Sequence, residues 1–252
     1  MSLRACAEIV RKGDPDRFLA TMAAPPAARA ALFPIYALNV EVARAAWVSQ
    51  EPAICEMRLQ WWHDQLAALG QGRAPDGNEV LRALAGRLDT GSARLMQRLV
   101  EAREADLKQA PFGDAEALLA YLEATAGGLM WAAARALGLE QGEAPVRALG
   151  RVSGLANWFL AVPELVARGR RPLPDTREAA IGALARDGLQ VLRRASGDIP
   201  KPARPATRTG WRARRTLRSA AANPAAVMGG LLHISEFSRR ASLLWHVLSG
   251  AP

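Results

Sequence analysis

Arginines are the side chains in this sequence that are best suited to bind a charged ligand. Arg44 and Arg58 lie within apolar helical patterns, and Arg168, Arg170 and Arg171 gather in a short loop that prolines close. A guanidinium presents several N–H donors in a planar fork, which matches the oxygens of a phosphate or diphosphate. Anion binding is therefore the first chemistry that the sequence suggests.

Carboxylates are scarce in the same segments. Glu41 is the only one in residues 36–50, and Glu164 is the only one in residues 150–174. Glu41 is either a buried functional carboxylate or the ion-pair partner of Arg44 one helical turn away. Both interpretations stay open at the level of the sequence.

Motifs for metals, nucleotides and nucleophilic catalysis are missing from the sequence. His63, His233 and His246 have no metal-ligand spacing, and neither a phosphate-binding glycine loop nor a nucleophile elbow occurs. Cys6 and Cys55 form no metal-binding or redox pair, which favours a reducing compartment. We expect no catalytic residue, no metal site, no cofactor and a cytoplasmic location.

The elements that must position these side chains are helices. Half of the residues are hydrophobic, β-branched residues are sparse, and few windows alternate with period two. We predict one all-α domain over residues 1–252, with helix starts at Asp14 and Asp114, each a good N-cap. The N-terminus lacks the apolar core of a secretory signal, and no window of ~18 residues is apolar enough to span a membrane.

Two adjacent tryptophans mark a helix that needs apolar cover on two sides. Leu59, Trp62, Leu66 and Leu69 follow helical spacing along one face, and Trp61 points away from them. The alternative is an ordinary core helix. We predict that this helix lies in the interior of the domain.

Glycines in mid-helix mark places of close approach. Gly127 and Gly128 interrupt one helical pattern, and Gly150 and Gly154 interrupt the next. Each costs about 1 kcal/mol relative to alanine, so a neighbouring helix or a ligand must approach closely enough to offset that cost.

The formal charge of +9 is concentrated in one segment. Residues 200–222 hold seven basic side chains and no acidic one, which leaves +2 for the rest of the chain and argues against a nucleic-acid-binding surface. We predict an internal linker over residues 196–210, followed by a helix that brings Trp211 and Leu217 to an anionic membrane on its inner face. An acidic partner, or a merely solvated segment, is the alternative. The seven basic residues are Lys201, Arg204, Arg208, Arg212, Arg214, Arg215 and Arg218.

Four segments in order resemble the squalene/phytoene synthase family. They are residues 33–41, which read Phe-Pro-Ile-Tyr-Ala-Leu-Asn-Val-Glu; residues 58–62, with arginine and two tryptophans; residues 121–128, which read Tyr-Leu-Glu-Ala-Thr-Ala-Gly-Gly; and residues 154–174, which lead to Arg-Arg-Pro-Leu-Pro. The resemblance implies an all-α terpenoid-synthase-like bundle with a central apolar cavity. It also implies candidates for the cavity wall or for remnants of a diphosphate site: Tyr36, Asn39, Glu41, Arg58, Trp62, Tyr121, Thr125, Asn157, Arg170 and Arg171.

Active members of this family hold Mg²⁺ with two aspartate-rich motifs on facing helices, and the metal neutralises the departing diphosphate. This sequence has Ala43 and Arg44 where the first motif is expected, and Glu164 alone near the second. It resembles a branch of the family that includes a phytoene-synthase-related assembly factor of mitochondrial complex I. The expected function is a non-catalytic helper of a membrane-associated complex, with a protein partner and an isoprenoid or lipid as candidate ligands. The alternatives are an active prenyltransferase with an atypical diphosphate site, which would need Mg²⁺, and an unrelated helical binding module.

Overall fold

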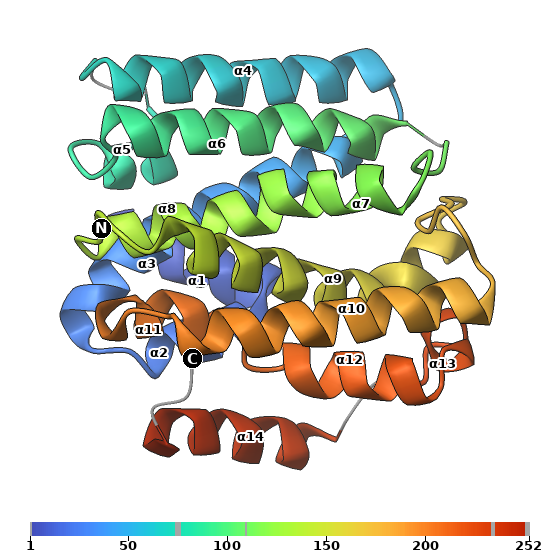
Figure 1. Ribbon diagram of the computed structural model, residues 1–252. Helices are drawn as coiled ribbons and strands as arrows, with labels where there is room; N and C mark the ends of the chain where they lie inside the picture. Colours follow the sequence, from blue (N-terminus) through green and yellow to red (C-terminus); the bar gives the residue numbers. More distant parts are fainter. Residues whose placement is uncertain (1, 74–76, 109, 233–234, 250–252) are drawn as a thin grey trace.

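The computed structural model describes residues 2–73, 77–108, 110–232 and 235–249, and every element within these ranges is a helix (Figure 1). The α-helices are α1 (Ser2–Gly13), α2 (Pro15–Met22), α3 (Pro26–Arg44), α4 (Pro52–Gly70), α5 (Glu79–Leu84), α6 (Thr90–Ala102), α7 (Ala115–Leu122), α8 (Gly128–Ala136), α9 (Glu143–Ala167), α10 (Glu178–Gly197), α11 (Arg204–Thr207), α12 (Ala213–Ala222), α13 (Ala225–Met228) and α14 (Glu236–Ser249). Single helical turns η1 (Ala45–Trp47), η2 (Arg103–Leu107), η3 (Glu123–Gly127), η4 (Lys201–Ala203) and η5 (Arg208–Gly210) join or extend them.

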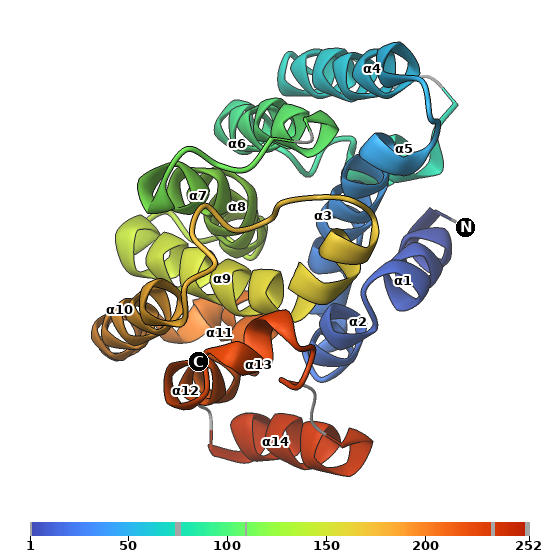
Figure 2. The same cartoon turned by 90° about the vertical axis from the view of Figure 1, so that its right-hand side faces the viewer.

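The long helices pack in series across the molecule. α4 contacts α6, α6 contacts α8, α8 contacts α9, α9 contacts α10 and α10 contacts α12, which gives the stacked arrangement in Figure 1. Figure 2 shows α1, α2 and α3 on the other side, and α3 contacts α1, α5 and α8. One continuous hydrophobic core joins both groups, so residues far apart in sequence meet at its centre.

Aspartate caps begin two helices as the sequence predicts. The Asp14 carboxylate accepts a hydrogen bond from the Arg17 amide at 2.9 Å, and the Asp114 carboxylate accepts one from the Ala117 amide at 2.8 Å. These bonds satisfy amide donors that have no partner within the first turn of a helix. The prediction of both helix starts is confirmed.

The helix that follows Asp114 is broken by a π-helical turn, which is η3 between α7 and α8. By length and composition Ala115–Ala136 would suffice to cross a membrane, contrary to our expectation from the sequence, but 67% of its apolar window is buried in the fold. Its contacts with α6 and α9 account for that apolar character. Such a helix is typical of a protein core.

Close helix contact explains the mid-helix glycines. A Cβ added at Gly150 would lie 2.7 Å from the Ala126 carbonyl oxygen, and one at Gly154 would lie 2.6 Å from the Ala126 Cβ. A Cβ at Gly127 would lie 3.1 Å from the Arg147 carbonyl oxygen. The prediction of close approach is therefore confirmed for α9 against η3.

The helix with two tryptophans lies at the edge of the bundle and not in its interior, as Figure 1 shows for α4. Trp62 is fully buried against the core, whereas Trp61 is only partly covered and Met57 is 64% exposed. Arg58 stacks over the two indoles, with its Cζ 5.6 Å from the centre of Trp61 and 6.0 Å from that of Trp62. The expectation of apolar cover on two sides is wrong, because a cation covers part of the outer face.

Residues 196–210 differ from the linker that we predicted. They include α11, η4 and η5, and Ala203, Ala206 and Thr207 are fully buried. Trp211 and Leu217, which we expected at a membrane surface, are also buried in the fold. Proline and arginine suggested an open segment, but small side chains allow short helices to pack here.

Candidate functional site

A cavity of about 360 Å³, which we call the central cavity, lies between α2, α3, η2, α7, η3 and α9. Apolar side chains such as Val40, Leu122 and Leu129 form part of its wall, and polar and charged residues form much of the rest. The charged members of the wall are Asp14, Arg17, Arg44, Arg103 and Asp106.

Each carboxylate on this wall is held by an arginine. Arg17 Nη1 donates to Asp14 Oδ2 at 2.6 Å, and the same aspartate caps α2. Arg103 Nη1 donates to Asp106 Oδ2 at 3.0 Å. Arg44 is the third arginine of the wall, and its Nη1 lies 3.4 Å from Glu41 Oε1. The wall residues thus include one more cation than anion, and Glu41, which lies just outside the wall, is the partner of the third cation, Arg44.

Tyr121 completes a buried three-residue network with Arg103 and Asp106. The Tyr121 hydroxyl donates to Asp106 Oδ1 at 2.8 Å and accepts from Arg103 Nη1 at 2.7 Å. Burial raises the pKa of Tyr121 above its ordinary value. Burial disfavours the charge of Arg103, but Tyr121 and Asp106 outweigh it and raise the pKa of that guanidinium. The network stays protonated on Tyr121 and charged on Arg103 near neutral pH.

Both tyrosines of the chain are expected to resist ionisation. Burial raises the pKa of Tyr36 to about 12, and it raises the pKa of Tyr121 as well. Both groups ionise near pH 10.0 when exposed, so the unfolded chain loses these protons first. The contribution of the two neutral tyrosines to the stability of the folded protein is therefore complete below pH 10. It declines as the pH rises toward 12.

An ultraviolet absorbance titration checks this expectation. The native protein should form no tyrosinate until it unfolds, whereas the protein in denaturant should titrate as free tyrosine. Reversible ionisation of either tyrosine near pH 10.0 in the folded protein would contradict the raised pKa values.

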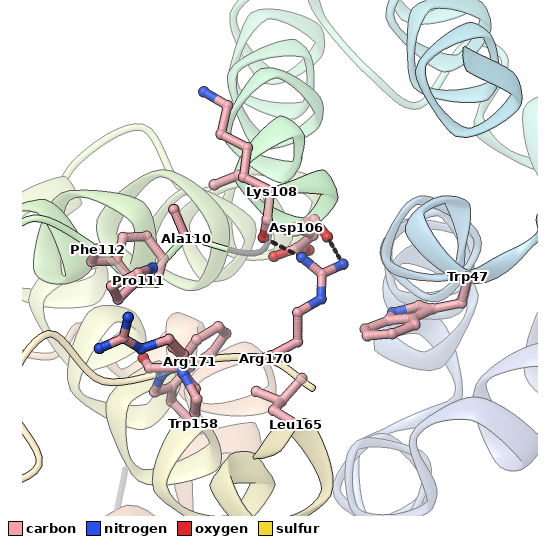
Figure 3. Close-up of a pocket in the computed structure, with 12 residues that line it drawn as sticks. Trp47, Asp106, Lys108, Ala110, Pro111, Phe112, Trp158, Leu165, Arg170 and Arg171 are labelled. Carbon is pink, nitrogen blue, oxygen red and sulfur yellow. Dashed lines mark hydrogen bonds between the residues drawn. The ribbon is translucent and has the colours of Figure 1, made fainter. Parts of the chain in front are cut away.

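A second cavity of about 240 Å³ adjoins the first and shares four wall residues with it. Figure 3 shows Trp47 on one side of it, with Pro111 and Phe112 on the other. The Arg170 guanidinium donates to the backbone carbonyls of Asp106 and Lys108 and lies 5.1 Å from the centre of the Trp47 ring. The shared residues are Trp47, Asp106, Trp158 and Leu165.

The candidate residues from the sequence divide into four groups. Asn39, Tyr121, Thr125 and Asn157 line the central cavity. Tyr36 lines a small neighbouring cavity of about 20 Å³, which Asn157 also reaches.

Arg170 and Arg171 line the second cavity. Glu41, Arg58 and Trp62 line neither of these two cavities. Glu41 pairs with Arg44, and its Oε2 also lies 3.8 Å from Arg58 Nη2, so the ion-pair interpretation holds. Trp62 belongs to the hydrophobic core.

The sequence did not indicate several residues that line the two cavities. Arg103 and Asp106 have the spacing of an ordinary surface ion pair, and their link to Tyr121 exists only in three dimensions. Trp47 and Trp158 lie in apolar patterns that resemble any core helix. Trp158 Nε1 donates to the Pro172 carbonyl at 2.9 Å, which ties α9 to the loop after it.

The described part of the chain contains no group of three or more His, Cys, Asp or Glu side chains that could hold a metal ion. His63 Nε2 lies 3.1 Å from Glu101 Oε1. His246 Nδ1 lies 2.9 Å from the Ser242 carbonyl oxygen. His233 lies outside the described residues.

Comparison with solved structures shows the fold. A dehydrosqualene synthase crystallised with a ligand superposes with a TM-score of 0.78 at 16% identity, over 99% of this chain and 96% of that chain. A squalene synthase from Alicyclobacillus acidocaldarius superposes with a TM-score of 0.73 at 16% identity, over 89% and 94% of the two chains. The architecture is therefore of the isoprenoid-synthase type.

Curated proteins with a related sequence are named assembly factors and not synthases. NADH dehydrogenase (ubiquinone) complex I, assembly factor 6 homolog of Drosophila melanogaster is 33% identical over 66% of this chain and 52% of its own length. The bovine assembly factor 6 is 27% identical over 68% of this chain and 52% of its own length. This chain spans about half the length of the curated relatives that it matches.

The family model described as squalene/phytoene synthase matches residues 10–233. That match covers most of the sequence and includes all four motif segments and every element around the central cavity. On this match and on its fold, the chain belongs to the squalene/phytoene synthase family.

Proposed function

We propose that this protein is a non-catalytic member of its family that helps to assemble or stabilise a membrane-associated respiratory complex. The observation that carries the proposal is the charge arrangement in the central cavity. Its two aspartates are each held by an arginine, and Ala43, Arg44 and Ala161 stand on the facing walls that α3 and α9 contribute.

This donor set does not fit Mg²⁺. The ion requires several hard oxygen ligands in octahedral geometry, commonly free carboxylates together with phosphate oxygens. Asp14 already caps α2 and binds Arg17, and Asp106 already binds Arg103 and Tyr121. Freeing either carboxylate would leave a buried or half-buried guanidinium without its partner, which supports a cavity that works without the metal.

The names of the curated relatives support the role in assembly. They are called assembly factors of complex I, and they match about two thirds of this chain. Because this chain spans only about half of their length, their partner comes to it as a proposal. That comparison supports a protein partner in a respiratory complex.

We further propose that the cavity binds an isoprenoid or another lipid. Apolar residues of α3, α7 and α9 can contact the hydrocarbon chain of such a ligand. Arg44, whose side chain is about half exposed, offers a guanidinium to an anionic group of the ligand. The same arginine supports the second candidate, a prenyltransferase with an atypical diphosphate site. Only the prenyltransferase would have enzymatic activity, so an activity assay distinguishes it from a lipid-binding protein without catalysis.

Contact with an anionic membrane on the cytoplasmic side belongs to the same proposal. Of the seven basic residues in this part of the sequence, Lys201, Arg214, Arg215 and Arg218 are exposed. Arg208 and Arg212 act inside the fold, since they bind the Ala23 carbonyl and Asp16. The four exposed residues would attract anionic lipid, and salt would weaken that attraction.

Deletion of the gene in its source organism tests the assembly role. We expect less assembled NADH dehydrogenase complex on native gels, with the other respiratory complexes at their normal level. Return of the wild-type gene should restore it. The purified protein should release no diphosphate from farnesyl or geranylgeranyl diphosphate with Mg²⁺.

Two results would overturn the proposal. Normal levels of the complex in the deletion strain would remove the assembly role. Mg²⁺-dependent release of diphosphate above a heat-inactivated control, lost in an Asn157→Leu variant that fills the cavity, would establish the prenyltransferase instead.

A further inference from the structure

The last described helix, α14, rests on the bundle through one side only. Leu243 packs with Ala20 of α2 and with Trp211 in a small cluster of its own. Arg239 Nη1 lies 3.3 Å from Asp16 Oδ1, which adds a polar contact to the same side. Figure 1 shows α14 beneath α12, at the opposite end of the molecule from α4.

The other side of α14 is apolar and exposed. Leu244, Trp245 and Leu248 are 58%, 69% and 75% exposed. Their spacing of one, three and four residues places them on one helix face, directed away from Leu243. Ala241, which is also exposed, extends the same stripe by one turn. Large apolar side chains gathered in this way mark a binding surface more often than chance exposure.

The surroundings of this stripe are basic. Arg240 is exposed on α14, and Arg214, Arg215 and Arg218 are exposed on α12. Arg215 and Ser242 line one small cavity between the two helices, so this arginine borders α14 directly. Residues 199–252 contain nine Lys and Arg but only one acidic residue, Glu236, so the sequence offers little to neutralise them.

We infer that the exposed face of α14, with the arginines beside it, docks on the surface of an anionic lipid bilayer. The apolar stripe then lies among the acyl chains near the headgroups, with the arginines at the level of the phosphates. Trp245 suits this depth, since an indole has an apolar body and a polar N–H that favour the membrane interface. Figure 2 shows α14 along the outside of the bundle.

Charge decides between a bilayer and a second copy of this chain. A symmetric pair through α14 would bring Arg240 and the arginines of α12 of both copies together, and like charges across an interface are costly. An anionic bilayer offers the opposite charge together with an apolar interior. This inference rests on the membrane contact proposed above and adds an apolar anchor, so that α14 replaces Trp211 and Leu217 in that role.

Vesicle flotation of the full chain tests the inference. The probes are phosphatidylcholine vesicles with and without phosphatidylserine, each at low and high salt. We expect the wild type to float with the anionic vesicles and to keep part of its binding at high salt. A Leu244→Ser/Trp245→Ser/Leu248→Ser variant should lose about tenfold or more in partitioning, because it removes the apolar contribution.

Two further variants make the result specific. Ile54→Ser/Met57→Ser removes exposed apolar side chains from α4 at the far end and should float as the wild type does. Arg214→Gln/Arg215→Gln/Arg218→Gln should lose the salt-sensitive part of the binding. Unfolding midpoints should stay unchanged in all variants, since the altered side chains are exposed.

The outcomes separate this inference from the proposed contact through basic residues. If the α14 variant floats as the wild type does while the arginine variant does not, the apolar anchor is wrong and the basic contact stands. If the wild type floats with neither kind of vesicle, both fail. Equal binding to neutral and anionic vesicles, equal loss in the α4 control, or a dimer in solution that the α14 variant dissolves would also overturn the inference.

Discussion

Replacing Gly150 with alanine should destabilise the fold by about 2–3 kcal/mol, as expected for an overpacked core. The new Cβ would lie 2.7 Å from the Ala126 carbonyl oxygen and 2.9 Å from the Gly127 Cα. Both neighbours are backbone atoms, so no side-chain rotation can relieve the contact. Urea unfolding followed by circular dichroism measures the loss as a lower midpoint at unchanged slope.

Gly197→Ala is the matched control for this substitution. Gly197 ends α10, and a Cβ added there would meet nothing within 4 Å. Alanine should leave stability unchanged or raise it by up to ~1 kcal/mol, because it restricts the unfolded chain. Equal effects of the two substitutions would mean that α9 does not pack on η3 as closely as described.

Asp106→Ala should cost about 3–5 kcal/mol, because it leaves the buried Arg103 guanidinium without its carboxylate. Both side chains of this pair are mostly shielded from solvent, at 19% and 14% exposure, so water compensates little. The same unfolding experiment measures the effect. If the free energy of unfolding falls by no more than it does for an ordinary surface substitution, the network does not stabilise the fold as described.

Two variants define what the network contributes. Tyr121→Phe keeps the ring but removes the hydroxyl from Asp106 and Arg103, and should cost only about 1 kcal/mol. Glu8→Gln breaks an exposed pair with Arg11 on α1 and should change stability too little to measure. The order of the three effects tests the role of burial.

Local signals in the sequence were sufficient to predict the helices and where several of them begin. Asp14 and Asp114 cap helices through contacts within three residues, so their effect does not depend on the rest of the fold. Gly150 and Gly154 revealed a close helix contact because their cost in a helix requires compensation. The ordered motifs then gave the family and its architecture.

Predictions of which side faces inward failed where the cover comes from a side chain outside the apolar pattern of that helix. Trp61 needed no helix above it, since Arg58 lies over its ring. Trp211 resembled a membrane anchor, but it packs with Ala20 and Leu243, which are distant in sequence. Periodicity gives the direction of a side chain and not the identity of its neighbour.

The cavity was the least predictable part of the structure. Its charged wall depends on Arg103, Asp106 and Tyr121, which come together from two elements on either side of a loop. Each residue alone resembles a surface ion pair or a packed aromatic ring. Only the fold brings them together.

The π-helical turn η3 determines how the residues before and after it are directed relative to the cavity. Successive residues of an α-helix turn by about 100°, so every step of four overshoots one full turn by about 40°. In an unbroken α-helix, Tyr121 and Leu129 would point about 80° apart. The wider turn offsets this drift and aligns Tyr121, Thr125 and Leu129 in one column along the cavity. Removing one residue from this turn would therefore restore a regular α-helix, in which seven steps of about 100° still leave Tyr121 and Leu129 within about 20° of one direction.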